Sequence, residues 1–299
     1  MQRPAMPNVR REDVRHHFAE RRQRLIESRQ RSPVTAVMAR FKEIDGATQG
    51  VLVSVQLFTV VIPLMILGFS YFEGFAENVS PGTVWIRELG LSGPTSDTVR
   101  AAFGNSAALR SVWTVVGVAA FLVWGIPMTS MVASLFAKAW RREQFGFGQR
   151  LSRGTLWFLL YLAMLVLRER TAYGADYTGA TQLLMFVIAL IPVWVFWSLT
   201  PVILVRDGGH GVKYLALAGL AGVVIDGIIV PVAGRILFPR VIDAWTNFGP
   251  IGVAMAIMTW CGILGTAWVI TACVGAVLWE RTAPTDTVLE AQTAETVDA

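Results

Sequence analysis

The chain has 299 residues, 54% of them hydrophobic and 16% charged, with a formal net charge of +5 at pH 7. The apolar residues come in blocks of about 20, which as helices cross a hydrocarbon core of about 30 Å, so the pattern excludes an ordinary soluble domain. The only two cysteines, Cys261 and Cys273, share one apolar block, which argues against a disulfide scaffold or a cysteine-based metal site. We predict an all-α, polytopic membrane protein with six transmembrane helices.

The N-terminal region, residues 1–45, is rich in arginine, and residues 12–30 can form a charged helix. One interpretation is a solvated cytoplasmic tail that helps to set the topology. The other is contact with anionic lipid, because clustered basic side chains beside a membrane are attracted to it. In the second case, Arg21, Arg22 and Arg24 would contact the membrane surface.

Residues 33–45 have the pattern of an amphipathic helix, with Pro33 well placed for its start. We predict an interfacial helix on the inner membrane face, with Phe41 in contact with lipid. The alternative is a soluble helix packed on the cytoplasmic loops. The apolar residues with helical spacing on one face are Val34, Val37, Met38, Phe41 and Ile44.

Residues 46–281 form the predicted transmembrane domain. Its third span is the shortest, and it reaches full length only if Arg168 and the charges beside it snorkel to the interface. A loop over 237–249 and an acidic, disordered tail over 282–299 are also predicted. The six predicted spans cover about residues 50–72, 112–137, 154–171, 179–205, 214–236 and 250–279.

The orientation follows from the positions of the basic residues. An internal N-terminus and six spans place most of the 26 Lys and Arg residues on the cytoplasmic side, chiefly in the N-terminal region and in a basic loop before the third span. Cytoplasmic segments of membrane proteins carry such an excess. Both termini are therefore predicted to be cytoplasmic.

Asp226 lies near the middle of the fifth predicted span. An acidic side chain at that depth is costly in lipid, so it should face protein or water. It is a candidate substrate- or ion-binding residue, able to carry protons, bind a cation or accept hydrogen bonds from a substrate. The alternative is a structural carboxyl group that only joins helices.

Polar residues of other spans are candidate partners for Asp226. A buried polar group needs hydrogen-bond partners, and hydroxyl and amide side chains of the other spans can supply them. The same hypothetical binding site is assigned to Gln56, Thr129 and Ser130, and further candidate partners are Thr59, Thr259 and Thr266.

Small residues surround Asp226 in the fifth span. They recur about every four residues, so they form a face that another helix can approach closely. The residues assigned to this packing face are Ala218, Gly219, Gly222 and Gly227.

Prolines interrupt four of the six predicted spans. Each proline removes a backbone hydrogen bond, and broken helices around a midplane site are common in transporters. Prolines without such a role are also frequent in membrane helices, so both interpretations stay open. The predicted helix breaks are at Pro63, Pro127, Pro192, Pro201 and Pro231.

The tryptophans fall into two groups. Trp140 and Trp279 are near predicted interfaces, where an aromatic belt explains them. Trp197 and Trp268 are deeper, and we expect them to pack the bundle or face lipid. Lining a hydrophobic path for an acyl chain is the alternative.

The last span opens with an aromatic-Gly-x-x-Gly step, Phe248-Gly249-Pro250-Ile251-Gly252, and ends after Gly275-Ala276. Over about residues 38–281 the order of features resembles the YihY/BrkB family of bacterial inner-membrane proteins, including its YhjD-like branch. The family often has Gly-Ala-Glu late in this span, where this chain has Val277. The resemblance implies six spans in a bacterial inner membrane and a link with envelope lipid export, without a settled biochemical activity.

The function predicted on this basis is a transporter or flippase-like protein for an envelope lipid or amphiphile. The alternative is a non-catalytic subunit or scaffold of a larger membrane complex. Membrane lipids are expected partners, and so is another membrane protein or a second copy of the chain. No motif for an enzyme, a metal, a cofactor or nucleic acid is present, and none of these is expected.

Overall fold

The computed structural model describes residues 32–71, 125–173, 179–209, 211–245 and 250–293, with a few isolated positions outside these ranges. The regular structure of these residues is entirely helical, which confirms the predicted all-α class. In chain order the helices are α2 (Pro33–Glu43), α3 (Gly46–Tyr71), a helix over 125–139, α7 (Phe147–Tyr173), α8 (Ala180–Leu204), α9 (Val212–Gly222), the π-helix η2 (Val223–Ile229), α10 (Val230–Trp245), α11 (Pro250–Thr282) and α12 (Thr285–Thr293).

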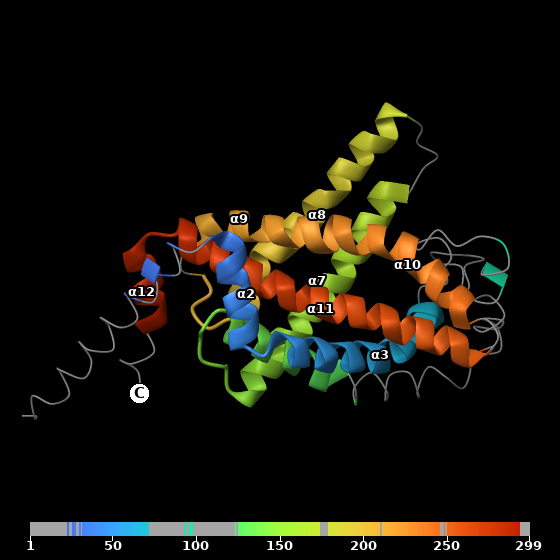
Figure 1. Ribbon diagram of the computed structural model, residues 1–299, viewed down its shortest axis with the longest axis horizontal. Coiled ribbons are helices and arrows are strands. Elements are labelled where there is room, and N and C mark those ends of the chain that lie inside the picture. The colour runs from blue at the N-terminus through green and yellow to red at the C-terminus, as the bar shows by residue number, and fades with distance from the viewer. Residues whose placement is uncertain are drawn as a thin grey trace, which may run out of the picture.

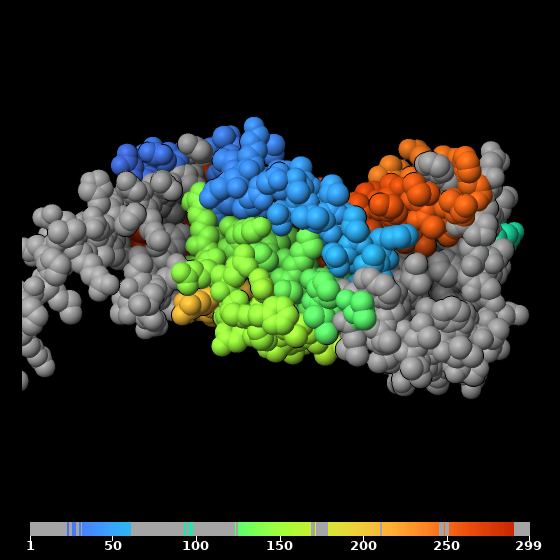
Figure 2. Space-filling view, turned by 90° about the horizontal axis from the view of Figure 1, so that it is seen from below, coloured from blue at the N-terminus to red at the C-terminus, as the bar shows by residue number. Residues whose placement is uncertain are grey.

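The bundle is elongated, and α11 runs along its centre (Figure 1). Helix α3 lies on one side of α11, and the continuous helix of α9, η2 and α10 lies on the other. Helices α7 and α8 pack against each other and cross the bundle obliquely. Figure 2 shows the surfaces of α2 and α3 beside the green surface that includes the helix over 125–139. We call the end where α2 and α12 lie the α2/α12 end.

Four described helices are long and apolar enough to cross a membrane: Phe147–Arg168, Ala180–Leu204, Val212–Ala244 and Ile251–Thr282. They correspond to the third to sixth predicted spans. In the first predicted span the described apolar part is shorter, Gly46–Val60, and much of the second lies outside the described residues. The chain is thus a membrane-embedded helical protein.

The central helix α11 is more deeply buried than the outer helices α7 and α8. In the most apolar window of α11, 61% of the residues are buried, against 28% in α7 and in α8. The outer faces of α7 and α8 carry exposed Leu, Val and Ile side chains, which a bilayer solvates as well as a protein core does. These two helices therefore present the widest lipid-facing surface among the described spans.

The third span begins earlier than predicted. Helix α7 starts at Phe147, so Arg150 and Arg153 belong to its first two turns instead of a loop. The Arg150 N–H donates to the Gly146 carbonyl at 2.9 Å, which continues the helical pattern to the start of α7. The prediction began the span too late because it required an uncharged segment, whereas basic side chains at a helix end can reach the interface.

The predicted loop over 237–249 is wrong in its first part, because α10 continues to Trp245. Phe238 and Ile242, four residues apart, are buried on one face of this helix. The Phe238 ring contacts Trp260 of α11 edge-on, with ring centroids 6.4 Å apart. Packing on α11 therefore holds the segment helical even though Pro239 lies within it.

The predicted disordered tail is also wrong where the structure describes it. Helix α12 covers Thr285–Thr293, and residues 294–299 lie outside the described part of the chain. The Val288 N–H donates to the Pro284 carbonyl at 3.1 Å, and the Val288 side chain is fully buried. One well-placed apolar side chain thus docks a segment whose composition is otherwise polar.

All five prolines predicted to break helices lie inside helices that continue. Helix α8 runs through Pro192 and Pro201, α3 runs through Pro63, and the helix over 125–139 includes Pro127. Inside a bundle the loss of one backbone hydrogen bond is tolerated, because the other turns keep theirs and neighbours satisfy freed carbonyls. Pro231 also leaves its helix continuous, but a change of helix type precedes it.

The predicted helix over 33–45 is present as α2, and Ser32 caps its start by accepting from the Thr35 N–H at 3.2 Å. Its buried face matches the predicted apolar face in part. Ala36, Arg40 and Ile44 are buried, Val37 and Phe41 are half-buried and pack against the core, and Val34 and Met38 are exposed. Arg21, Arg22 and Arg24 of the predicted membrane contact lie outside the described residues.

Arg40 is the centre of an ion-pair network at the α2/α12 end. Its Nη2 donates to both carboxylate oxygens of Glu280 at 2.8 Å, and its Nη1 donates to the Ala139 carbonyl. Both side chains of this pair are almost completely buried, at 2% and 3% exposure. Arg141 adds a second bidentate pair with Glu43 at 2.8 and 2.5 Å. The network joins α2, the end of the helix over 125–139, and the last turns of α11.

Burial alone would lower the pKa of the Arg141 guanidinium, but the hydrogen bond with Glu43 and the charges of Glu280 and Glu43 raise it above its ordinary value. Arg141 therefore stays charged at any physiological pH.

The predicted aromatic belt does not describe Trp140 and Trp279, because both are buried here and their rings lie 5.5 Å apart. The guanidinium of Arg142 lies 5.4 Å from the Trp279 ring.

Candidate functional site

Asp226 lies within the π-helix η2, Val223–Ile229, near the middle of a 33-residue apolar helix. Its side chain is 3% exposed, so it faces protein and not lipid. Single π-helical turns inside α-helices are rare and occur often at functional sites. A buried acid in a π-helical turn of a membrane span is thus the strongest candidate for a functional group in the described part of the chain.

Pro231 accounts for the change of helix type. A proline has no N–H to donate four residues back, and its ring clashes with the carbonyl at that position, here Gly227. Just before it, the Val230 N–H donates to Ile225, five residues back, as in a π-helix. Widening the turn before the proline relieves the clash and leaves the Gly227 carbonyl open to another donor.

Two side chains from neighbouring helices donate hydrogen bonds to this π-helical turn. Trp197 of α8 donates from its indole Nε1 to Asp226 Oδ2 at 3.3 Å. Arg168 of α7 donates from Nη2 to the Gly227 carbonyl at 3.3 Å, and its charge is close enough to act on Asp226. A carboxylate, an indole and a guanidinium from three helices therefore meet inside the bundle.

An aromatic cluster surrounds this polar group. Tyr161 lies 5.1 Å from Trp268 and 5.4 Å from Phe196, and Phe196 lies 5.3 Å from Trp197, measured between ring centroids. Trp157 stacks on Tyr161 at 5.8 Å, and its Nε1 donates to Thr200 Oγ1 at 3.1 Å. The cluster lowers the local dielectric, which strengthens every electrostatic interaction of Asp226.

Trp268 of α11 completes the site. Its indole N–H is buried, makes no hydrogen bond of good geometry with a described atom, and lies near both Asp226 and Tyr161. Asp226 thus has one hydrogen-bonded indole, Trp197 of α8, and a second indole N–H nearby, that of Trp268 of α11.

The glycines of the predicted packing face lie where α8 approaches α9 and η2. A Cβ on Gly222 would lie 2.0 Å from Trp197 Cγ, and one on Gly219 would lie 2.0 Å from Ser198 Oγ. At Gly227 the nearest atom would be Leu190 Cδ2, at 3.1 Å. Ala218 is buried as well. The absence of side chains at Gly219 and Gly222 lets α8 bring Trp197 up to Asp226.

None of the polar residues predicted beside Asp226 is hydrogen-bonded to it in the described part of the chain. Thr129 Oγ1 donates to the Ile126 carbonyl at 3.0 Å, one turn back in its own helix. Gln56 on α3 is half-buried, and its buried Oε1 has no hydrogen-bond partner among the described atoms. Ser130 is half-buried. The recorded hydrogen bond of Asp226 comes from Trp197, so the expected partner set is corrected to an indole of α8.

Thr59 and Thr259, two of the three further candidates, behave like Thr129, whereas the third, Thr266, faces Gly50 of α3, where a Cβ would lie 3.2 Å from its Oγ1. Thr59 Oγ1 donates to the Gln56 carbonyl at 2.8 Å, and Thr259 Oγ1 donates to the Met255 carbonyl at 2.9 Å. A threonine hydroxyl in a helix reaches its own preceding turn more easily than a distant chain. Because the backbone carbonyl of the preceding turn competes for the hydroxyl donor, a threonine in a span is a weak indicator of a hydrogen bond between helices.

Arg168 is the functional residue that the sequence interpretation missed. It was expected to snorkel out to the interface, but it is half-buried and reaches across to η2. A signal was available, since a basic residue near the end of one span and an acidic residue inside another can pair within the bundle. Tyr161 and the two indole donors carry no comparable signal, because an aromatic residue in a span is ordinary.

Among the described residues no group of three or more His, Cys, Asp or Glu side chains is arranged to hold a metal ion. Asp226 therefore has indole and guanidinium neighbours and not further carboxylates. This arrangement suits the exchange of a proton or the binding of a cationic or hydrogen-bonding group. Comparison of the chain with protein-family models, with characterised proteins and with solved structures finds no match.

The Trp197–Asp226 hydrogen bond makes a measurable prediction. Trp197→Phe keeps an aromatic ring but removes the donor, and we expect a loss of about 1–3 kcal/mol in the free energy of unfolding, because a buried acceptor loses its partner. Trp194→Phe on the same helix is the matched control, since Trp194 is partly exposed and its Nε1 bonds the Ala216 carbonyl. Unfolding in mixed micelles measures both. Equal losses in the two variants would contradict a special role for the Asp226 contact.

Proposed function

We propose that this protein is an integral inner-membrane transporter, flippase-like in action, that moves an envelope lipid or amphiphile and uses Asp226 as its proton- or cation-exchanging group. The observation that carries the proposal is the burial of Asp226 in a π-helical turn in the middle of a span. Ionisable groups at such positions are costly, and they mark ion pathways and proton relays in transporters.

The surroundings of Asp226 support a switching role. The carboxyl group is held by a neutral donor, Trp197, while the guanidinium of Arg168 is hydrogen-bonded to a carbonyl one residue away. On losing a proton, the carboxylate gains attraction for Arg168, which lies on a different helix. Proton exchange would therefore change the forces between α7 and the π-helical turn, and helix shifts of this kind couple ion binding to transport.

The proposal includes a bacterial inner-membrane location, six spans with cytoplasmic termini, and membership of the YihY/BrkB-like group that the sequence resembles. The four apolar helices and the exposed faces of α7 and α8 are compatible with a substrate that enters sideways from the bilayer. No nucleotide-binding motif is present in the sequence, so uphill movement would depend on an ion gradient or on a partner protein.

Asp226→Asn tests the proposal, because it keeps the shape of the side chain and removes its ability to ionise. The full chain is reconstituted in vesicles of phosphatidylethanolamine and phosphatidylglycerol that carry a fluorescent phosphatidylglycerol, with an imposed pH gradient. Dithionite bleaches the dye on the outer leaflet only, so loss of the protected signal reports transbilayer movement. We expect movement with the natural protein and the protein-free rate with Asp226→Asn.

Thr259→Val is the control, since it removes a polar group from a span at an exposed position whose hydroxyl bonds its own helix. It should move lipid at the natural rate. If the natural protein moves neither fluorescent phosphatidylglycerol nor fluorescent phosphatidylethanolamine faster than protein-free vesicles do, lipid transport is rejected. If Asp226→Asn moves lipid normally, the assignment of Asp226 is rejected.

A non-catalytic subunit of a larger membrane complex is the second candidate. The outer face of α8 favours it, because its exposed apolar side chains form a long surface that a partner helix covers as well as lipid does. Copurification of a stoichiometric membrane protein from native membranes, lost when bulky residues are placed on this face, would distinguish the subunit from an independent transporter.

A further inference from the structure

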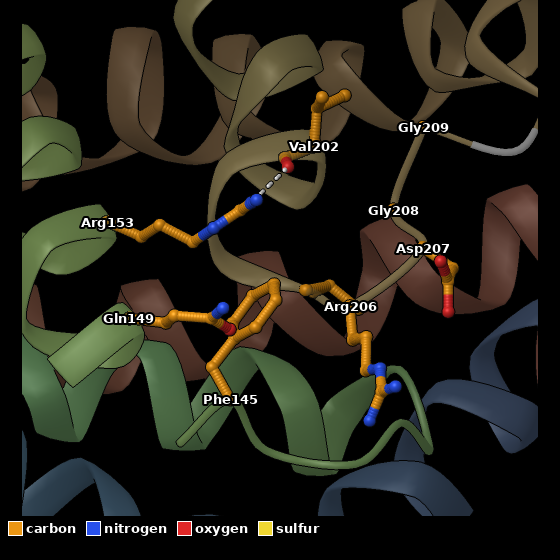
Figure 3. Close-up of a pocket in the computed structure, with 9 residues that line it drawn as sticks. Phe145, Gln149, Arg153, Val202, Arg206, Asp207, Gly208 and Gly209 are labelled. Carbon is orange, nitrogen blue, oxygen red and sulfur yellow. Dashed lines mark hydrogen bonds between the residues drawn. The ribbon is translucent and has the colours of Figure 1, made fainter. Parts of the chain in front are cut away.

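A cavity of about 670 Å³ lies between α7 and α8 at the α2/α12 end (Figure 3). Three segments form it: the chain leading into α7, the first turns of α7, and the last turn of α8 with the turn after it. It is not part of the Asp226 site, because none of its lining residues is in contact with that group. Its lining includes Phe145, Gln149, Arg153, Val202, Arg206 and Asp207.

Arg153 crosses the cavity from α7 to α8 (Figure 3). Its Nη1 donates to the Val202 carbonyl at 3.4 Å and to the Ile203 carbonyl at 3.2 Å. These are carbonyls of the last helical turn of α8, which have no intrahelical donor. Its guanidinium carbon lies 4.3 Å from the centre of the Phe145 ring. These contacts orient the guanidinium, which is exposed, and the hydrogen bonds to the carbonyls use only one of its three nitrogens.

Arg206 also lines the cavity, and its guanidinium points away from Arg153 (Figure 3). It pairs with Glu143 at 3.3 Å, and the two side chains are 40% and 59% exposed, so this contact is weak and exchangeable. Gln149 adds a neutral amide, and the carboxylate of Asp207 lies at the far edge of the cavity (Figure 3). Arg153, together with an Arg206 side chain that exchanges its exposed contact with Glu143 for the ligand, suits a bulky singly charged anion such as a phosphodiester.

The apolar surface next to the cavity continues along both helices. Leu156 and Leu160 follow Arg153 at i+3 and i+7 on α7, and they are 50% and 39% exposed. Leu199 and Val195 precede Val202 by three and seven residues on α8, and they are 44% and 43% exposed. A polar cavity at the ends of two spans therefore opens directly onto an apolar surface at the depth of the acyl chains.

We propose that this cavity binds the phosphate-bearing headgroup of an anionic membrane phospholipid, whose acyl chains lie along the exposed faces of α7 and α8. The two guanidinium groups recognise the phosphodiester, and the apolar side chains above them contact the chains. A free phosphate ion would contact the guanidinium groups but would leave the apolar faces of α7 and α8 without a role in binding. The inference does not depend on Asp226 or on transport.

Native mass spectrometry of the full chain in detergent tests the site, with phosphatidylglycerol and phosphatidylcholine as probes at equal concentrations. We expect the natural protein to retain phosphatidylglycerol preferentially and Arg153→Gln/Arg206→Gln to lose that preference. Arg206→Gln alone, at an exposed position, should weaken the preference without affecting the fold, as checked by the melting temperature. Lys213→Gln, which removes a charge at the same end but outside the cavity, should keep it.

Three results would overturn the proposal. Equal retention of the two lipids by the natural protein would show that headgroup charge is not recognised. A loss in Lys213→Gln as large as that in Arg206→Gln would assign the binding to general surface charge. Displacement of phosphatidylglycerol by inorganic phosphate, with phosphate itself retained on the protein, would identify a soluble phosphate site.

Discussion

Glu280→Ala is expected to lower the free energy of unfolding by about 3–5 kcal/mol, because it removes the bidentate partner of the buried Arg40 guanidinium. The remaining anion beside it is Glu43, 3.5 Å from Arg40 Nε and 44% exposed, which replaces only a small part of the lost pairing. Arg40 is 2% exposed and donates to both carboxylate oxygens of Glu280 at 2.8 Å. Removing one partner of such a pair is far more costly than removing both, since the remaining charge cannot reach water. Unfolding of the full chain in mixed micelles, followed by tryptophan fluorescence, measures the loss.

The double variant Arg40→Met/Glu280→Leu should recover most of this loss, because apolar side chains of similar volume avoid the desolvation cost of both ions. Arg206→Ala is the exposed control, and its weak pair with Glu143 should be worth no more than about 1 kcal/mol. A Glu280→Ala variant as stable as Arg206→Ala would mean that water reaches the pair and that it does not hold α2 to α11.

Gly222→Ala is the second large effect that we expect. The new Cβ would lie 2.0 Å from Trp197 Cγ and 2.3 Å from Cδ1, closer than any stable contact. Trp197 is buried between Phe136 and Phe196, with ring centroids 6.3 and 5.3 Å away, so it has little room to move. We expect overpacking to cost about 1–3 kcal/mol or more and to displace the indole from Asp226.

Gly262→Ala is the matched control, because nothing lies within 4 Å of a Cβ at this helical position of α11. Alanine is a better helix former than glycine by about 1 kcal/mol, so this variant should be neutral or slightly stabilised. Melting temperatures of the two variants, with the transport assay above, separate packing from function. Equal stability of the two would show that α8 does not press on Gly222 as closely as the structure indicates.

Several elements followed from local properties of the sequence. The third to sixth predicted spans are helices, because a predominantly apolar segment of about 20 residues satisfies the length of a bilayer whatever lies beside it. Asp226 was correctly expected to face protein, because the cost of an acid in lipid depends on depth alone. The segments over 237–245 and 285–293 were misjudged, since Phe238, Ile242 and Val288 make them helical through contacts with distant residues.

The sequence by itself determined that this is a helical membrane protein with a buried carboxyl group in one span, because hydropathy and burial cost are properties of short segments. Only the tertiary structure decided the partners of each charge. Arg40 pairs with Glu280, which is 240 residues away in the sequence, and Asp226 accepts a hydrogen bond from Trp197, which is 29 residues away. The charge of Arg168, on a third helix, also acts on Asp226. Such pairs depend on how the helices pack, which a linear pattern of apolar residues does not specify.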